Sequence, residues 1–488
     1  MKNRMLTDSI ALASVKVFTM ATSILATMIL SRTLPLSDYG TYSAGNLIIN
    51  TATLLSAFGL MDAVNFYYNG KKNEAKTEYT NTVFFLISIC GVIAAFVIIA
   101  GQKLITQYFH NPMLTTIYAY IAFRPLLQNY TFGLQNLQVS IGKAKVVAIR
   151  NAVLSATKLG AIILTAVWTR DINTIFKCML IVEIIALLFY NKILKINNVH
   201  VLPHRPEVTK IKEILCFCIP MGVYIQTNTL SRDLDKFIIG FFESTEKLAV
   251  YTNCSAKLPF DVISGPLLML LIPVLTRCIQ NNDNKNGTEI FKCYIKIGYI
   301  FTLTLGFGCI VVAKQAVQFL YGEKFIQGVG IFVVYIIVDM INFISYSLVL
   351  SAKGKTKDLM YVSCGSLVIN LFINYLFYQC MGFIGPAIAT VIITLGVSSL
   401  LLIKSAKILE TRIHHLFDKK HLLIFGSEII VLSVFAQLFK SVLLKMSVHY
   451  FIILCLVGAF FVITMLVLNL KEIKKCFGIL NTINRKEI

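Results

Sequence analysis

The sequence predicts an all-α polytopic membrane protein with about fourteen transmembrane helices. Of its 488 residues, 57% are hydrophobic and only 14% are charged, and the mean hydropathy is +0.74. These values lie outside the range of ordinary soluble domains. Apolar runs recur from Ile10 to Leu470, and a run of about 20 residues, rising about 1.5 Å per residue, crosses a hydrocarbon core about 30 Å thick.

Short loops separate the predicted spans. The first span follows a short basic N-terminus, but it is longer than the apolar part of a signal peptide and lacks a cleavage site of small residues, so we expect it to be retained. The predicted spans cover residues 10–32, 41–68, 80–102, 113–134, 146–169, 172–194, 213–241, 250–276, 291–313, 329–352, 358–379, 383–405, 421–443 and 448–470.

The basic residues predict the orientation. The chain has 45 Lys and Arg against 24 Asp and Glu, and with the N-terminus inside most of the basic residues fall in cytoplasmic loops, as the positive-inside rule requires. We therefore expect a multi-pass protein of the bacterial cytoplasmic (inner) membrane with both termini cytoplasmic. No basic stretch carries interleaved aromatic residues or a binding module, so we expect no nucleic-acid partner.

The residue types needed for catalysis are not grouped along the chain. The twelve cysteines lie mostly within or beside predicted spans, where cysteine is a small hydrophobe, and we expect neither disulfides nor a metal site. Every loop is short, so no soluble catalytic domain fits, and no phosphate-binding loop for ATP occurs. These features favour transport over catalysis and indicate no cofactor.

Two short patterns recur at nearly the same distance. Tyr42 and Tyr251 end similar strings 209 residues apart, and Gly142-Lys143-Ala144-Lys145 resembles Gly354-Lys355-Thr356-Lys357 at an offset of 212. Either the chain is duplicated or these short strings match by chance. Duplication predicts two pseudo-symmetric six-helix lobes, residues 1–200 and 201–412, related by an axis along the membrane normal. Residues 413–488 would then form two additional helices and a cytoplasmic tail.

Several strings resemble a known family. They are Ser31-Arg32-x-Leu34-x-x-x-x-Tyr39-Gly40-x-Tyr42, Gly59-Leu60-x-Asp62-Ala63-Val64, Leu234-Asp235-Lys236-Phe237-Ile238-Ile239-Gly240 and Leu271-Ile272-Pro273-Val274-Leu275. They look like the Wzx-type polysaccharide-biosynthesis flippases of the multidrug/oligosaccharidyl-lipid/polysaccharide (MOP) exporter superfamily, which includes the MATE-like exporters. The resemblance implies two lobes that alternately open a central cavity, and an undecaprenyl-pyrophosphate-linked oligosaccharide as substrate, such as an O-antigen unit of lipopolysaccharide, a capsule unit or an exopolysaccharide unit. Ala249 departs from the pattern because it stands where the first copy has Gly40.

Cations within or beside the spans are the candidate substrate site, because charged groups at bilayer depth usually face a cavity or a partner. A pyrophosphate needs such cations in a low-dielectric interior. In span 113–134 helical spacing places Arg124 and Gln128 on one polar stripe with Thr131 and Gln135; this stripe is either a cavity wall or a packing face. The candidate binding residues are Lys16, Arg32, Arg124, Gln128, Lys158, Arg232, Lys236 and Lys257.

Some of these cations have carboxylates one helical turn away. Arg232 with Asp235 and Lys257 with Asp261 are spaced to form structural ion pairs instead of a substrate site. Carboxylates can also couple transport to H⁺ or Na⁺, and the candidates for this role are Asp62, Asp235 and Asp339.

Three functions remain open at this point. The first is a flippase for lipid-linked oligosaccharide, with membrane lipids, a polysaccharide polymerase and glycosyltransferases as expected partners. The others are a cation-coupled multidrug exporter and a peptidoglycan lipid-precursor flippase of the same superfamily. A cavity lined by acids and aromatics would favour drug export, whereas a cationic cavity shared by Lys16, Arg124, Lys158 and Lys257 would favour an anionic lipid-linked substrate.

Overall fold

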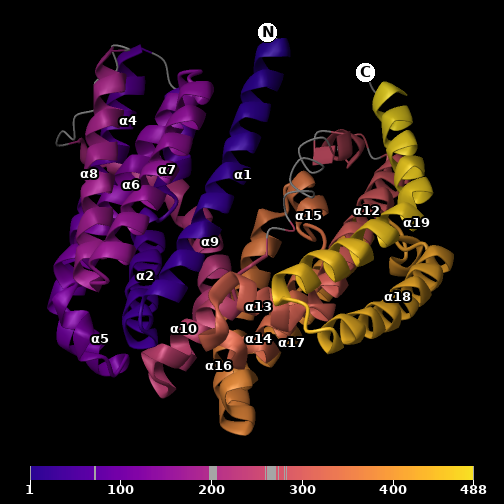
Figure 1. Ribbon diagram of the computed structural model, residues 1–488. Helices are drawn as coiled ribbons and strands as arrows, with labels where there is room; N and C mark the ends of the chain where they lie inside the picture. The colour runs from indigo at the N-terminus through magenta and orange to yellow at the C-terminus, as the bar shows by residue number, and fades with distance from the viewer. Residues whose placement is uncertain are drawn as a thin grey trace. The chain divides into compact units, whose positions relative to one another are not determined.

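The computed structural model describes residues 2–486 except 71–72, 197–205, 259, 261–270, 273, 280 and 282. Every regular element in the described part is helical, and the chain divides into two compact units, Met1–Thr252 and Asn253–Ile488 (Figure 1). Ten described stretches are long and apolar enough to cross a membrane. The protein is therefore an all-α, multi-pass membrane protein, as predicted.

The first unit is built around a central polar helix, α6. Figure 1 shows α4, α6, α7 and α8 side by side, and α6 packs against α2, α4 and α8 while α1 packs along α7. The helices are α1 (Lys2–Thr33), α2 (Leu36–Ala57), α3 (Leu60–Gly70), α4 (Asn73–Ala100), α5 (Gln102–Tyr108), η1 (Pro112–Thr116), α6 (Tyr118–Ser140), α7 (Ala144–Trp168), α8 (Ile172–Ile196), α9 (Val208–Phe242) and α10 (Thr245–Cys254), the last of which crosses the unit boundary.

The second unit continues the series and ends in two long helices. Among its described residues α12 packs against α14, α18 and α19, and α16 packs against α17. The helices are α12 (Asn284–Val311), α13 (Ala313–Tyr321), η2 (Glu323–Gly328), α14 (Val329–Ile341), α15 (Leu348–Ala352), α16 (Thr356–Met381), η3 (Gly382–Ile384), α17 (Gly385–Ile408), η4 (Ile413–His415), α18 (Lys419–Lys445) and α19 (Tyr450–Lys486).

The predicted spans coincide with these helices, with three differences. Span 41–68 is two helices, because Phe58 adopts a left-handed backbone (φ 38°) between α2 and α3. Span 329–352 is broken between α14 and α15. The middle of span 250–276 lies outside the described residues. The total of about fourteen stays a prediction, because α6 and α9 are not among the ten described apolar stretches and α16 and α17 lie in one continuous stretch.

Helix boundaries recur along the chain at a nearly constant offset. α1 ends at Thr33 and α2 begins at Leu36. Both boundaries recur 209 residues later, where α9 ends at Phe242 and α10 begins at Thr245. α12 begins and ends 211 residues after α4, and α16 begins 212 residues after α7. Chance similarity of short strings does not align element boundaries over this length. The recurring boundaries favour the internal duplication over a chance match, while the duplication itself and the lobe limits at residues 200 and 412 stay predictions.

The two Gly-Lys strings form the same turn in both copies. Gly142 and Gly354 both have a left-handed backbone, with φ of 79° and 75°. The following amides, of Lys143 and Lys355, donate to the carbonyl oxygen five residues earlier at 3.0 Å and 2.9 Å. This is a glycine-terminated helix end, in which the left-handed residue satisfies a carbonyl of the last helical turn. The turn explains why this short string was kept in both copies.

Packing explains the difference between Gly40 and Ala249 in the repeat. A Cβ atom at Gly40 would lie 2.7 Å from the backbone carbonyl carbon of Thr245, so α2 and the start of α10 approach too closely for any side chain. Ala249 is fully buried but keeps its Cβ. The first copy therefore requires glycine here for a reason of local packing, and the substitution in the second copy does not argue against the duplication.

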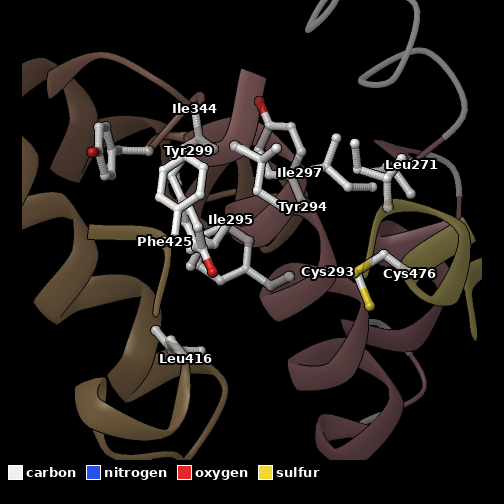
Figure 2. Packing of buried hydrophobic residues seen from close by; sticks show 14 of the residues in the cluster. Leu271, Cys293, Tyr294, Ile295, Ile297, Tyr299, Ile344, Leu416, Phe425 and Cys476 are labelled. Atoms are coloured by element: carbon white, nitrogen blue, oxygen red, sulfur yellow. The ribbon is translucent and has the colours of Figure 1, made fainter. Parts of the chain in front are cut away.

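The core of the second unit joins α12 to α18 and α19. Figure 2 shows Tyr299 packed near Phe425, with 5.5 Å between the ring centroids, and the thiols of Cys293 and Cys476 side by side. All twelve cysteines are free thiols. Cys293 and Cys476 are less than 5% exposed and act as small core residues, as the sequence predicts.

A polar network also holds the two C-terminal helices to α12. Lys296 on α12 is 6% exposed, and its Nζ lies 2.9 Å from Asp418 Oδ2 and 2.5 Å from Glu472 Oε2. One turn further along α12, the Tyr299 hydroxyl is 2.6 Å from His421 Nδ1. A buried ammonium is stable only with such partners, so α18 and α19 are joined to the duplicated part by specific bonds as well as by apolar contact.

Candidate functional site

The candidate site lies on α6, whose polar stripe faces neighbouring helices. Arg124, the seventh of the 23 residues of α6, is only 4% exposed. Gln128 follows one turn later on the same face. Its Oε1 accepts a hydrogen bond from Thr53 Oγ1 of α2 at 3.1 Å, which orients the amide with its NH₂ group away from α2.

That NH₂ group and three further donors meet at one carboxylate, Glu183 of α8. Arg124 binds it bidentately, with Nε to Oε2 at 3.1 Å and Nη2 to Oε1 at 3.0 Å. Lys158 Nζ of α7 donates to Oε1 at 3.2 Å, and Gln128 Nε2 donates to the same oxygen at 3.1 Å. Two cations therefore share one anion, and the cluster carries a net charge of +1.

The cluster keeps unused donors and an approach from its surface. The side chains of Arg124 and Glu183 are each 5% exposed, whereas that of Lys158 is 30% exposed. Arg124 Nη1 is buried and has no hydrogen-bond partner in the described structure. A buried guanidinium normally satisfies its donors, so the cluster has spare hydrogen-bonding capacity for an anion that arrives beside Lys158.

Glu183 is the residue that the sequence analysis missed, and the structure shows that it is the carboxylate partner of both Arg124 and Lys158. Glu183 lies 59 residues from Arg124 and 25 from Lys158, so helical spacing could not pair them. One signal was present: it is an isolated acidic residue within an apolar span, and intramembrane ionisable groups are functional candidates by default. Whether these cations bind substrate stays a prediction.

The stripe continues as a packing face. Gln135 Nε2 donates to Tyr190 Oη at 2.9 Å and to Asn151 Oδ1 at 3.1 Å. Near this end Arg150, a buried cation that was not among the candidates, lies 3.0 Å from the centre of the Tyr190 ring and donates to Gln138 Oε1. This part of α6 therefore matches the alternative of interhelical hydrogen bonding.

The remaining cationic candidates do not join the cluster within the first unit. Lys16, Arg32 and Arg232 are exposed, so their side chains lie on the unit's surface. Lys257 is also exposed and belongs to the second unit. A cavity shared by Lys16, Arg124, Lys158 and Lys257 thus remains a prediction.

The charged cluster of α9 is paired differently from the expectation. Lys236 forms an ion pair with Asp233 at 2.5 Å. Asp235 is buried and accepts hydrogen bonds from the Tyr251 hydroxyl at 3.0 Å and from its neighbour's backbone amide at 2.8 Å. The expected Arg232–Asp235 pair is not formed in the described structure, because Asp235 bonds to Tyr251 of α10 instead. The Lys257–Asp261 pair lies outside the described residues.

The other coupling candidates are separate from this cluster. Asp339 Oδ2 accepts a hydrogen bond from the Leu258 amide at 3.1 Å, and Asp62 is half-buried at the start of α3. Within the described ranges no group of three or more His, Cys, Asp or Glu side chains is placed to hold a metal ion. Coupling by Asp62, Asp235 or Asp339 stays a prediction.

A second polar site is a cavity of about 690 Å³ in the second unit. It lies between Ile272 and Thr276 on one side and the segment that joins α14 to α16 on the other. Hydroxyl groups and one ammonium line it, which are groups that bind sugar hydroxyls and phosphates. Its polar side chains are Thr276, Ser345, Ser347, Ser351 and Lys353.

Known structures share this fold. A structure described as the lipid II flippase MurJ in an inward closed conformation superposes with a TM-score of 0.70 at 16% identity, covering 96% of this chain and all of that one. An inward-facing multidrug resistance MATE family transporter of the MOP superfamily gives a TM-score of 0.62 at 14% identity, covering 80% of this chain and 94% of that one. The chain therefore has the fold of MOP-superfamily transporters.

Sequence comparison gives curated relatives that match over a shorter part of the chain. One is the probable lipid II flippase MurJ of Rickettsia prowazekii (strain Madrid E), 21% identical over 193 residues, which are 37% of this chain and 37% of that protein. The match thus spans just over a third of the relative's length. This relative and the two solved structures are described as flippases or transporters, in line with the expectation of a transport protein rather than an enzyme. The family model for polysaccharide biosynthesis proteins matches residues 29–329, more than half of the chain, and the chain belongs to that family.

Proposed function

We propose that this protein is a flippase that moves an undecaprenyl-pyrophosphate-linked oligosaccharide across the cytoplasmic membrane by alternating access. One observation supports this proposal most directly: Arg124, Glu183 and Lys158 form a largely buried cluster of net charge +1 in which one guanidinium nitrogen has no hydrogen-bond partner in the described structure. In a low-dielectric interior such a cluster favours an anion and disfavours a cationic drug. Membership of a polysaccharide-biosynthesis family supports a glycan as the attached group.

In this proposal the head group approaches Lys158, the most accessible cation of the cluster, and then reaches Arg124. Arginine suits phosphate because its planar fork presents paired donors, whereas lysine acts as a mobile point charge. Several moderate contacts allow release when the site opens to the other face. Arg32, Arg232, Lys236 and Lys257 would add contacts along the path, and an ion, H⁺ or Na⁺, would drive the cycle at Asp62, Asp235 or Asp339.

A second candidate is a peptidoglycan lipid-precursor flippase. The likeness to the MurJ structure, with a TM-score of 0.70 over 96% of the chain, favours it over drug export, since the MATE structure scores 0.62 over 80%. This alternative also requires an anionic lipid-linked substrate, so it needs the same net positive charge in the cluster. The family match favours the oligosaccharide.

Complementation of a strain that lacks the protein tests the proposal. We expect the wild-type protein to restore surface glycan, and Arg124→Ala or Lys158→Ala to abolish it while the protein still reaches the membrane. Arg124→Lys should restore export only in part because the bidentate fork is lost. Lys103→Ala, an exposed lysine of α5 outside the cluster, is the matched control and should export normally.

The same strain separates the rival functions. Loss of glycan export with lipid-linked oligosaccharide accumulating on the inner leaflet supports the proposal. Accumulation of the peptidoglycan precursor with cell lysis would support the second candidate instead. Normal glycan with increased drug sensitivity would show that the protein is a drug exporter and refute both.

A further inference from the structure

Glu183 stands where an incoming anion would have to bind. It occupies the bidentate face of Arg124 and also takes the Lys158 ammonium and the Gln128 amide. A phosphate needs the same donors. While Glu183 is ionised, the cluster offers one net positive charge, whereas a pyrophosphate esterified at both ends carries two negative charges. The ionised cluster is therefore mismatched to this ligand by one charge.

We propose that Glu183 is an internal counter-ion that the pyrophosphate displaces, and that Glu183 takes up one proton when the head group binds. The inference rests on the proposed function and assigns Glu183 a positioning and coupling role within it. The proton comes from hydronium or a buffer acid in the solvent: an O–H bond of the donor breaks, the O–H bond of the carboxylic acid forms, and the donor's conjugate base stays in solution. Arg124 and Lys158 then present two positive charges to two negative ones, and the occupied site is neutral.

Burial is the reason that Glu183 protonates instead of staying charged. It is 5% exposed, and a buried carboxylate that loses its cations neutralises because water cannot solvate it. Helices α2, α6 and α7 pack against α8. The charged or titratable groups that they bring to the cluster are Arg124 from α6, Lys158 from α7 and Tyr42 from α2, whose ring contacts Phe176 of α8. Among these described groups no third cation is available to replace those taken by the ligand.

The same arrangement explains why an unoccupied cationic site is stable in a membrane. Two neighbouring cations without an anion, the buried Arg124 and the partly exposed Lys158, would repel each other and be disfavoured. Glu183 compensates them in the empty state and is neutralised in the occupied state. The site therefore never carries more than one uncompensated charge, and the binding free energy depends on pH.

Binding to the purified full-length protein in lipid nanodiscs tests this exchange. The probe is a short-chain prenyl pyrophosphoryl-N-acetylglucosamine, a doubly esterified pyrophosphate that does not itself titrate between about pH 6 and about pH 8. Calorimetry in two buffers of different ionisation heat counts the protons taken up. We expect about one proton per ligand for the wild type, and an affinity that falls about tenfold per pH unit as pH rises.

Two variants locate the proton. Glu183→Gln should bind more tightly than the wild type at high pH, with no proton uptake and no pH slope. Glu428→Gln is the matched control, because Glu428 lies in a span of the second unit and accepts a hydrogen bond from Asn469 at 3.0 Å. This variant should still take up about one proton per ligand and show the same pH dependence of affinity as the wild type. If Glu183→Gln does not fold, the proton count of the wild type alone decides.

The outcomes separate this inference from the proposed function. Ligand binding by the wild type without proton uptake would overturn the exchange at Glu183 and leave the flippase proposal intact. Proton uptake that persists in Glu183→Gln would also overturn it, because another group would be titrating. Failure of the wild type to bind the probe at any pH would refute the proposed function and this inference together.

Discussion

Breaking the Arg124–Glu183 pair should cost stability in a strongly non-additive way. The variants are Arg124→Gln, Glu183→Gln and the double variant. Removing Arg124 leaves the buried Glu183 with only Lys158 and Gln128, and removing the charge of Glu183 leaves two cations side by side. Removing one partner of a buried pair typically costs about 3–5 kcal/mol. Because Lys158 compensates part of the charge, we expect about 3 kcal/mol for each single variant.

The double variant should cost less than the sum of the single variants by about 2 kcal/mol, because it leaves neither charge without its partner. Equilibrium unfolding in mixed micelles, or steric trapping in bicelles, gives the three free energies. A control cycle pairs Glu183→Gln with Lys296→Met, since these residues lie in different units and share no partner among the described bonds. That cycle should be additive within about 0.5 kcal/mol. Additive effects for Arg124 and Glu183, or single costs below about 1 kcal/mol, would refute the buried pair.

Three further predictions concern other parts of the chain. Gly40→Ala should destabilise the protein by about 1–3 kcal/mol by overpacking, because its Cβ would lie 2.7 Å from a backbone carbon, whereas Gly365→Ala, with open space around it, should be neutral or stabilising in the same unfolding assay. The hydrogen bond from Lys296 holds the pKa of Asp418 below its usual range. Ionised Asp418 therefore stabilises the fold above its ordinary pKa of about 3.9, and this contribution is lost as pH falls through the lowered value. In Lys296→Met, the free energy of unfolding should consequently fall less between about pH 5 and about pH 2 than it does in the wild type. Reporter fusions placed after the sixth predicted span and at the C-terminal end should both report a cytoplasmic location, and an outward signal from either would contradict the predicted topology.

Patterns of residues close together in the sequence predict most of the helices of this fold. Apolar run length predicts which segments become membrane helices, since a span must satisfy its backbone internally and face lipid. The recurring Gly-Lys strings indicate the duplication, because a helix that ends with a left-handed residue favours glycine at that position, and both strings form such an end. Helical spacing also placed Arg124, Gln128 and Gln135 on one face of α6. Each of these features depends on residues that are close in the chain, so one sequence contains the information needed.

Only the tertiary structure decided which charges neutralise which. Glu183 meets Arg124 and Lys158 because α6, α7 and α8 pack together, and no spacing rule connects residues on three helices. Within α9, several pairings were compatible with helical spacing, and contact with Tyr251 selected the position of Asp235. Electrostatic energy in a low-dielectric interior depends on distance in space. The sequence by itself therefore determined the multi-pass helical class and the cationic bias and predicted the repeat, while packing determined that Arg124 and Lys158 carry their own counter-ion.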